Sequence, residues 1–180
     1  PEGILDIHAG AVLLACGGFE ASAAQRVRYL GPDWEDVHVR GTRHNTGELL
    51  ERVAALGAQM GGHLDGAHAV PVDAGSPEVG DLYLGDLTAR LSYPLGIMVN
   101  QDAQRFINEG MDFKSYSYTV MGPAILRQPG GMAYQIFDQQ TVERLETRYG
   151  SGSRPVIAET IEELASKLGL PPEAMVRTVT

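Results

Sequence analysis

An apolar run near the start of the chain most constrains the fold, because it stops abruptly at two glycines. Val12, Leu13 and Leu14 follow one another without interruption, and the pair Gly17-Gly18 stands shortly after them. An unbroken apolar run bounded by glycines is typical of a strand that is buried on both faces. The glycines would allow a sharp turn or the close approach of a ligand. The sequence therefore predicts a strand of a larger sheet, and an ordinary strand followed by a tight turn is the simpler interpretation.

The sequence around this run lacks the loop that normally binds phosphate groups. Such a loop reads G-x-G-x-x-G between a strand and a helix, and this string occurs nowhere in the 180 residues. We therefore interpret the run as one piece of a larger nucleotide-binding unit.

Composition indicates a globular protein and excludes several classes of partner. Apolar residues make up 43% of the chain and charged residues 21%, as in average folded domains. The net charge of −9 disfavours nucleic acids and anionic membranes, which both need a basic surface. No apolar stretch approaches the roughly 20 residues of a membrane span, and no signal peptide is evident. The single cysteine, Cys16, is expected to be a small buried side chain, and the expected location is cytoplasmic.

The pattern of apolar, capping and breaking residues predicts a mixed α+β fold. Predicted helices cover residues 20–30, 47–56, 114–127, 139–149, 160–169 and 171–180. Predicted strands cover residues 96–100, 104–108 and 133–138, and the first two are expected to form a hairpin. Thr46 is expected to cap the helix at 47–56. Residues 61–87 are predicted to form a long loop, and such loops are often functional.

Six stretches in this order resemble one known family. They read AVLLACGGFEAS, NTGELLERVAALGA, HAVP, GIMVNQDAQRFINEG, AYQIFD and TIEELASKLG. Over nearly its whole length the chain resembles the flavoprotein subunits of fumarate reductases and succinate dehydrogenases. Within this family, RLSYPLGIMVN and EGMDFKSYSY are most similar to FAD-dependent tricarballylate dehydrogenases.

The resemblance implies how the chain is divided. Residues 1–45 would be the residual edge of an FAD-binding domain, and residues 46–180 would be an α+β capping domain that carries part of the substrate site. The chain is therefore expected to be a fragment of a longer protein, with the phosphate loop upstream and further active-site residues downstream. The missing FAD-binding domain of the same chain is an expected partner, and the oligomeric state stays open.

The resemblance also implies the activity of the intact protein, an FAD-dependent oxidoreductase acting on CH-CH bonds. Two hydrogens would leave adjacent carbons of a polycarboxylate such as tricarballylate, giving its alkene, cis-aconitate. A hydride would pass to the flavin and a proton to a base. This chain alone is expected to bind no FAD and to be inactive, because it lacks the loop and helix that hold the pyrophosphate. No metal is expected. By resemblance, the FAD site is lined by Gly17, Gly18, Thr46, Gly47 and Glu48.

Three residues are candidates for binding the carboxylate substrate. His68 in HAVP matches the histidine that binds a substrate carboxylate in this family, and the alternative is a loop histidine bonded to nearby backbone. Arg90 lies near the position of an arginine of the family's proton relay, and the alternative is a surface arginine. Glu109 matches the family's R-F-x-N-E motif, and the alternative is a structural ion pair with Arg105.

The catalytic residues depart from the fumarate reductase pattern. Fumarate reductases place an arginine four residues after the glutamate of that motif, but Phe113 occupies this position and Lys114 follows it. This departure argues against fumarate reduction. Lys114 and Tyr116 are the candidates for the proton acceptor, with Tyr118 as a further tyrosine, and aromatic packing is the alternative for both tyrosines. We expect Lys114 to point into the same cleft as His68.

The charge of the central segment leaves other functions open. Between Asp65 and Asp112 there are eight acidic residues and only two arginines, which would repel a tricarboxylate unless the acids face away from the cleft. The first alternative is therefore a flavin-dependent ketosteroid dehydrogenase with a neutral substrate, or a fumarate reductase-like enzyme. An alternative of another class is a non-catalytic module that binds a small molecule.

Overall fold

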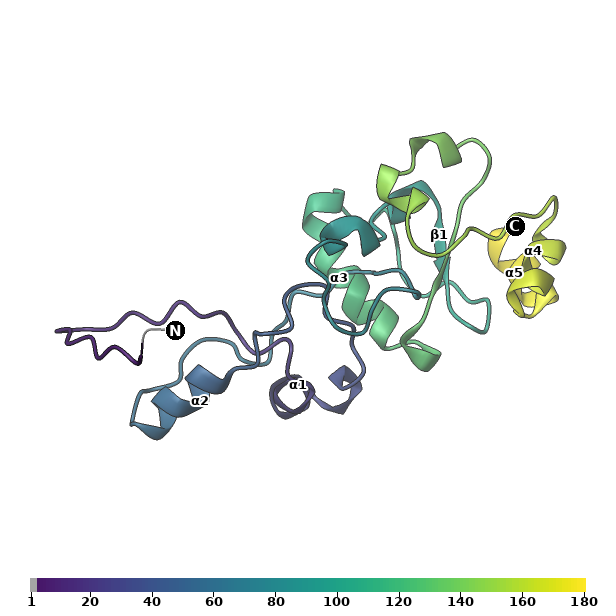
Figure 1. Ribbon diagram of the computed structural model, residues 1–180. Helices are drawn as coiled ribbons and strands as arrows, with labels where there is room; N and C mark the ends of the chain where they lie inside the picture. The colour runs from purple at the N-terminus through teal and green to yellow at the C-terminus, as the bar shows by residue number, and fades with distance from the viewer. Residues whose placement is uncertain (1–2) are drawn as a thin grey trace.

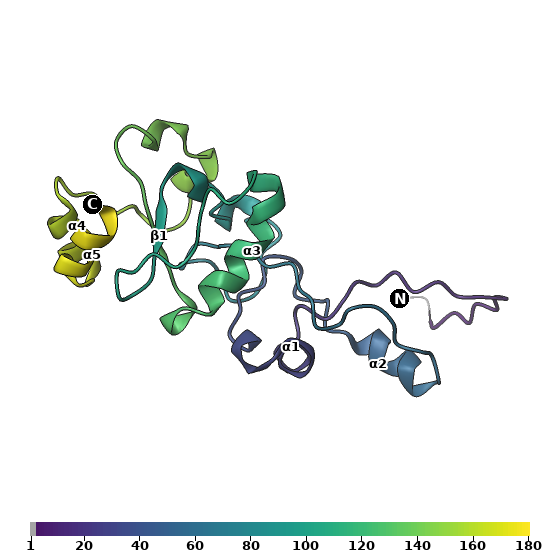
Figure 2. The same cartoon turned by 180° about the vertical axis from the view of Figure 1, so that it is seen from behind.

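The computed structural model describes residues 3–180 as an elongated chain of helices around one small sheet. Figure 1 shows the N-terminal segment and α2 at one end, α3 and the sheet in the middle, and α4 with α5 at the other end. Figure 2 shows the same order from behind. The helices are α1 (Ala23–Leu30), α2 (Glu48–Ala55), α3 (Lys114–Leu126), α4 (Ile161–Leu168) and α5 (Pro172–Val179), and the strands are β1 (Ile97–Val99) and β2 (Tyr134–Ile136).

The two strands pair with each other, and the predicted hairpin of residues 96–100 and 104–108 is confirmed only in part. β1 and β2 are antiparallel, with Ile97 opposite Ile136 and Val99 opposite Tyr134. After β1 the side chain of Asn100 accepts hydrogen bonds from the backbone of residues 102 and 104, which closes a tight turn. A single bridge between Val99 and Arg105 is all that remains of the expected second strand. The strand expected at residues 133–138 forms as β2 and is the strand that pairs with β1.

β1 is the strand that is buried on both faces. Val99 packs into one cluster with Ala165 and Met175 of the α4–α5 pair. Met98, which points to the opposite face, packs with Tyr93 and Met121 against α3. The core therefore consists of two clusters that share this three-residue strand.

The predicted strand at Val12–Leu14 does not form. Residues 3–16 have no regular secondary structure, Leu13 is 91% exposed, and Cys16 is exposed rather than buried. Among residues 3–180 no strand lies beside this segment, and an extended segment without a neighbour has no partner for its backbone hydrogen bonds. Figure 1 shows the segment extending away from the sheet.

The helix predictions are mostly confirmed, with two corrections at the level of local structure. Gly47, not Thr46, is the N-cap residue of α2. Residues 139–149 form two short 3-10 turns, at Val142–Arg144 and Thr147–Gly150, where one α-helix was predicted. Within residues 3–180, no helix has both the length and the apolar character that crossing a membrane requires.

A buried ion pair between Asp73 and Arg90 holds three irregular segments together. Arg90 Nη2 lies 2.9 Å from Asp73 Oδ2, and both side chains are nearly inaccessible to water. Asp73 also accepts hydrogen bonds from the hydroxyl and backbone N–H of Ser153, at 2.7 and 3.1 Å. The remaining guanidinium donors bind backbone carbonyls, those of Leu87, Ala89, Arg148 and Ser151.

Tyr149 connects this ion pair to the sheet. The Arg90 guanidinium lies 5.2 Å from the centre of the Tyr149 ring. The Tyr149 hydroxyl donates to Gln135 Oε1 in β2 at 2.5 Å and accepts from the Ser92 backbone at 2.9 Å. Burial raises the pKa of Tyr149 to about 12. The phenol therefore stays protonated and serves as a structural donor.

The first prediction concerns the pH dependence of stability. Burial by itself would raise the pKa of Asp73, but hydrogen bonds from Ser153 and Gly75 and the charge of Arg90 together lower it. A lowered pKa gives stabilisation that is complete above the unfolded-state value of about 4 and is lost as the pH falls through the folded-state value. Asp73→Asn should therefore lower the free energy of unfolding at neutral pH by about 3 kcal/mol.

Denaturant unfolding of the full-length protein across pH measures this difference. The gap between wild type and Asp73→Asn should shrink below about pH 4, where the wild-type carboxylate becomes protonated. Asp102→Asn is the control, because Asp102 is exposed and no residue in 3–180 donates a hydrogen bond to its carboxylate. A gap that stays constant down to the most acid pH would contradict the assigned role of Asp73.

Candidate functional site

The two segments predicted to line an FAD site meet in space. The backbone N–H of Ala21 donates to the carbonyl of Asn45 at 2.9 Å, and Asn45 Nδ2 donates to Glu20 Oε1 at 2.5 Å. Gly17 has a φ of +85°, in the left-handed region that favours glycine, and a β-carbon there would lie 2.5 Å from Asn45 Oδ1. The predicted FAD residues Gly17 and Gly18 therefore lie beside the segment that contains Thr46, Gly47 and Glu48.

Gly47 is the second glycine at which these two segments approach each other closely. Its φ of +78° is in the left-handed region, and a β-carbon there would lie 2.8 Å from the β-carbon of Phe19. No side chain within residues 3–180 caps the start of α2, so the first amide N–H groups of this helix are open to donate to a ligand. We call this junction of residues 17–21 and 45–48 the glycine rim. Its small residues and free donors fit one part of a flavin nucleotide.

His68 lies on an open groove that it shares with residues 18–20 of the glycine rim. The groove has a volume of about 2370 Å³, and its lining includes Gly18, Glu20 and His68. The His68 ring is exposed and contacts the Tyr118 ring edge-to-face, with 5.2 Å between the ring centres. A substrate held at His68 would therefore lie on the same groove as residues 18–20, while residues 45–48 of the rim do not line this groove. The alternative of a loop histidine bonded to nearby backbone has no support within residues 3–180, where no hydrogen bond to its ring occurs.

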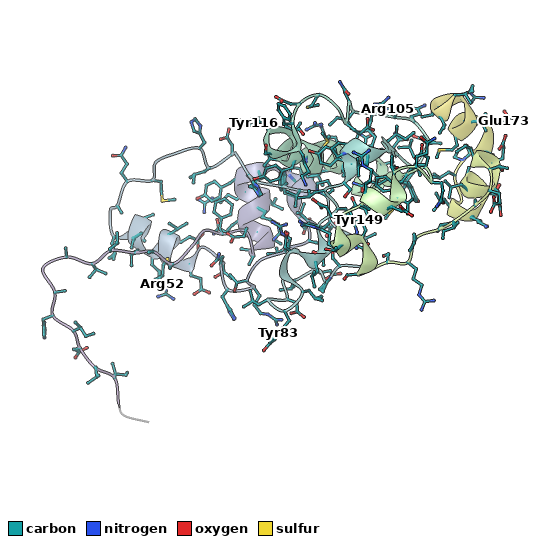
Figure 3. The ribbon with its side chains drawn as sticks, turned by 90° about the horizontal axis from the view of Figure 1, so that it is seen from above. Arg52, Tyr83, Arg105, Tyr116, Tyr149 and Glu173 are labelled. Atoms are coloured by element: carbon teal, nitrogen blue, oxygen red, sulfur yellow. The ribbon has the colours of Figure 1, made fainter. Side chains whose placement is uncertain are left out.

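Lys114 and Tyr116 do not line this groove. The Lys114 ammonium forms an ion pair with Glu146, whose second carboxylate oxygen lies 3.1 Å from Arg148 Nε. Tyr116 is 73% exposed, and Figure 3 shows it at the outer edge of the molecule. Glu146 itself lines the groove, so Lys114 lies beside the groove, and the expectation that Lys114 points into the cleft of His68 stays a prediction. Lys114 is the first residue of α3, and the turn at 147–150 presents Glu146 to it.

Arg90 and Glu109 have structural contacts. Arg90 is not a surface arginine. Its guanidinium nitrogens already donate to Asp73 and to four backbone carbonyls, which leaves them engaged rather than open to a substrate. Glu109 is 2% exposed and accepts from the Met98 backbone at 2.5 Å and from Arg105 Nε at 2.9 Å. The structural alternative for Glu109 therefore agrees with the geometry. Substrate binding by either residue stays a prediction that these contacts do not favour.

Three residues that contribute to the site are absent from the sequence-based candidates. Asn45 holds the glycine rim together, Glu146 pairs with Lys114, and Gly122 lets α3 approach the backbone next to His68. Only Gly122 carries a sequence signal, because a glycine inside a helical pattern often marks a close packing contact. Within residues 3–180, no group of three or more His, Cys, Asp or Glu side chains is arranged to hold a metal ion.

Comparison with known proteins gives one family and several relatives. The family model described as FAD binding domain matches residues 1–180. A 3-oxosteroid 1-dehydrogenase of Mycobacterium tuberculosis is 31% identical over 93% of this chain and 31% of its own length. The chain thus spans about a third of the length of this curated relative.

Solved structures share the fold. A 3-ketosteroid delta1-dehydrogenase from Sterolibacterium denitrificans matches with a TM-score of 0.62 and 22% identity, over 92% of this chain and 31% of that one. The open conformation of a flavocytochrome c3 fumarate reductase matches with a TM-score of 0.61 and 24% identity, over 91% of this chain and 27% of that one. At these identities the likeness concerns the fold.

The glycine rim gives the second prediction. Gly47→Ala should weaken FAD retention by the full-length protein about tenfold, equivalent to ~1.4 kcal/mol. The reason is that the added methyl group would push Phe19 away from α2 and open the rim. The measurement is the ratio of flavin absorbance to protein after gel filtration.

Gly57→Ala is the matched control for backbone strain. Gly57 also has a positive φ, +97°, but a β-carbon there would meet no atom within 4 Å. Its variant carries similar strain without touching the rim. Equal flavin retention by the two variants would remove Gly47 from the cofactor site.

Proposed function

Because the chain belongs to the FAD binding domain family, we propose that it forms part of an FAD-dependent oxidoreductase that removes hydrogen from adjacent carbons beside a carbonyl group. The relatives that support this proposal are FAD-dependent dehydrogenases and reductases by name or by family. Since the chain spans about a third of the dehydrogenase that it matches, the activity is assigned to the whole protein. FAD supplies the hydride acceptor when it is bound.

The family model described as FAD binding domain covers residues 1–180 in one match. The division into an FAD-domain edge at residues 1–45 and a capping domain at residues 46–180 therefore stays a prediction. The expectation that this chain alone binds no FAD also stays a prediction. We propose that the glycine rim contacts FAD and that His68 donates a hydrogen bond to a substrate oxygen.

A neutral cyclic ketone is the leading substrate class. The observation that carries it is the apolar lining of the groove on either side of His68, which includes Ala67, Ala69 and Val70. Phe113 stands where fumarate reductases place an arginine, and the charge of Lys114 is balanced by Glu146. An uncharged, apolar substrate matches such a surface better than a tricarboxylate does. The 31% identity to a 3-oxosteroid dehydrogenase also supports this class.

A polycarboxylate such as tricarballylate is the second candidate. It is favoured by the stretch EGMDFKSYSY, which is similar to tricarballylate dehydrogenases. His68, exposed on the groove, suits a carboxylate as well as a ketone, because its ring can donate a hydrogen bond to either.

The third prediction separates these candidates. Under anaerobic conditions, the flavin absorbance of the FAD-loaded full-length protein should bleach on addition of 4-androstene-3,17-dione and stay unchanged with tricarballylate. The reason is that only an oxidisable substrate transfers its hydride to the flavin. Bleaching by tricarballylate alone would reverse the order of the two candidates. Bleaching by neither, in a protein that retains FAD and binds the steroid, would favour the non-catalytic module.

The fourth prediction concerns the proton acceptor. An ammonium in an ion pair has no free electron pair, so Lys114 acts as a base only after it has lost its proton. If Lys114 does so, Lys114→Met should lower turnover by about 100-fold with little change in the Michaelis constant, because a base acts mainly in the transition state.

Lys167→Met is the matched control, since Lys167 forms a comparable pair with Glu163 on α4, at 2.7 Å. Its turnover should equal that of the wild type. Unchanged turnover in Lys114→Met, together with a large loss in Tyr116→Phe, would assign the role to Tyr116.

A further inference from the structure

We propose that Tyr118 is a positioning residue that fixes the ring of His68 on the groove, and that Gly122 makes this contact possible. The inference rests on the proposed function of His68 as a substrate-binding residue. It is carried by two contacts that α3 makes with the loop containing His68.

The first contact is between the two rings. His68 and Tyr118 meet edge-to-face, with 5.2 Å between ring centres and 69° between ring planes, an arrangement that aromatic pairs prefer. His68 lies in a segment without regular secondary structure. Within residues 3–180 no side chain or backbone group forms a hydrogen bond with its ring. The orientation of the exposed ring therefore depends on the Tyr118 ring.

The second contact is between helix and loop backbone. Gly122 lies four residues after Tyr118, so the two share one face of α3. A β-carbon on Gly122 would lie 2.5 Å from the carbonyl carbon of Ala69 and 2.7 Å from the nitrogen of Val70. Glycine at this position thus lets the backbone of the residues directly after His68 pack against α3. Together the two contacts position both the backbone of the loop and the ring of His68.

The ring of Tyr118, and not its hydroxyl, makes the contact with His68. Tyr118→Phe should therefore preserve the position of His68, whereas Tyr118→Leu should release it. This distinction separates a positioning role from proton transfer, because a proton-transfer role would require the hydroxyl.

The test uses the FAD-loaded full-length enzyme with the substrate that bleaches its flavin. Tyr118→Leu should raise the Michaelis constant about threefold to tenfold with turnover within about twofold, and Tyr118→Phe should match the wild type. Gly122→Ala should act like Tyr118→Leu, although it alters neither ring. Val120→Ala, on a partly exposed position of the same helix, is the control for α3.

A second readout does not depend on activity. Diethyl pyrocarbonate modifies exposed imidazoles, and peptide mass mapping gives the rate at His68 alone. Tyr118→Leu and Gly122→Ala should accelerate this modification, and Tyr118→Phe should not. Thermal unfolding confirms that each variant is folded before its rate is interpreted.

The outcomes distinguish this inference from the proposed function. If His68→Ala raises the Michaelis constant but Tyr118→Leu changes neither that constant nor the modification rate, the positioning role is refuted. Equal losses in Tyr118→Phe and Tyr118→Leu would also refute it, because they would implicate the hydroxyl. If His68→Ala has no effect on substrate binding, the proposed role of His68 fails, while the modification rate still decides whether Tyr118 fixes the ring. In the His68→Ala background, Tyr118→Leu should add no further loss.

Discussion

The buried ion pair of Asp73 and Arg90 is the interaction on which most of the middle of this molecule depends. Long stretches of the chain have no helix or strand, so their backbone groups need partners from side chains. Arg90 donates to four backbone carbonyls and to the carboxylate of Asp73, and thereby joins residues 71–76, 87–90 and 148–153. A guanidinium is suited to this task because its donors are fixed in one plane and it stays charged when buried.

The same network reaches the sheet and, through it, the core. Tyr149 packs on Arg90 and donates to Gln135 of β2, which pairs with β1. Because β1 is buried on both faces, it links α3 on one side to the α4–α5 pair on the other. The loops of the groove and the helix that supports His68 are therefore positioned against one shared strand.

The candidate site in this chain depends on close approaches between segments far apart in the sequence. Gly17 and Gly47 bring residues 17–21 against residues 45–48, and Gly122 brings α3 against the backbone that follows His68. Residues 18–20 of the glycine rim and His68 then line one open groove. Under the proposed function, a cofactor and a substrate bound along this groove would be held near each other, which is what hydride transfer requires.

The sequence by itself determined the positions of five helices, the strands at residues 97–99 and 134–136 and the family, because capping residues, periodicity and motif order can be read along the chain. The family resemblance also named Gly17, Gly18, Thr46, Gly47 and Glu48 of the glycine rim, but not Asn45, which joins its two segments. Which strand pairs with β1, why Val12–Leu14 stays unpaired and which carboxylate holds Lys114 were decided only by the tertiary structure. The physical reason is that strand pairing, burial and ion pairs each need a partner from elsewhere in the chain. A local pattern shows that a residue needs a partner, but it does not show which segment supplies one.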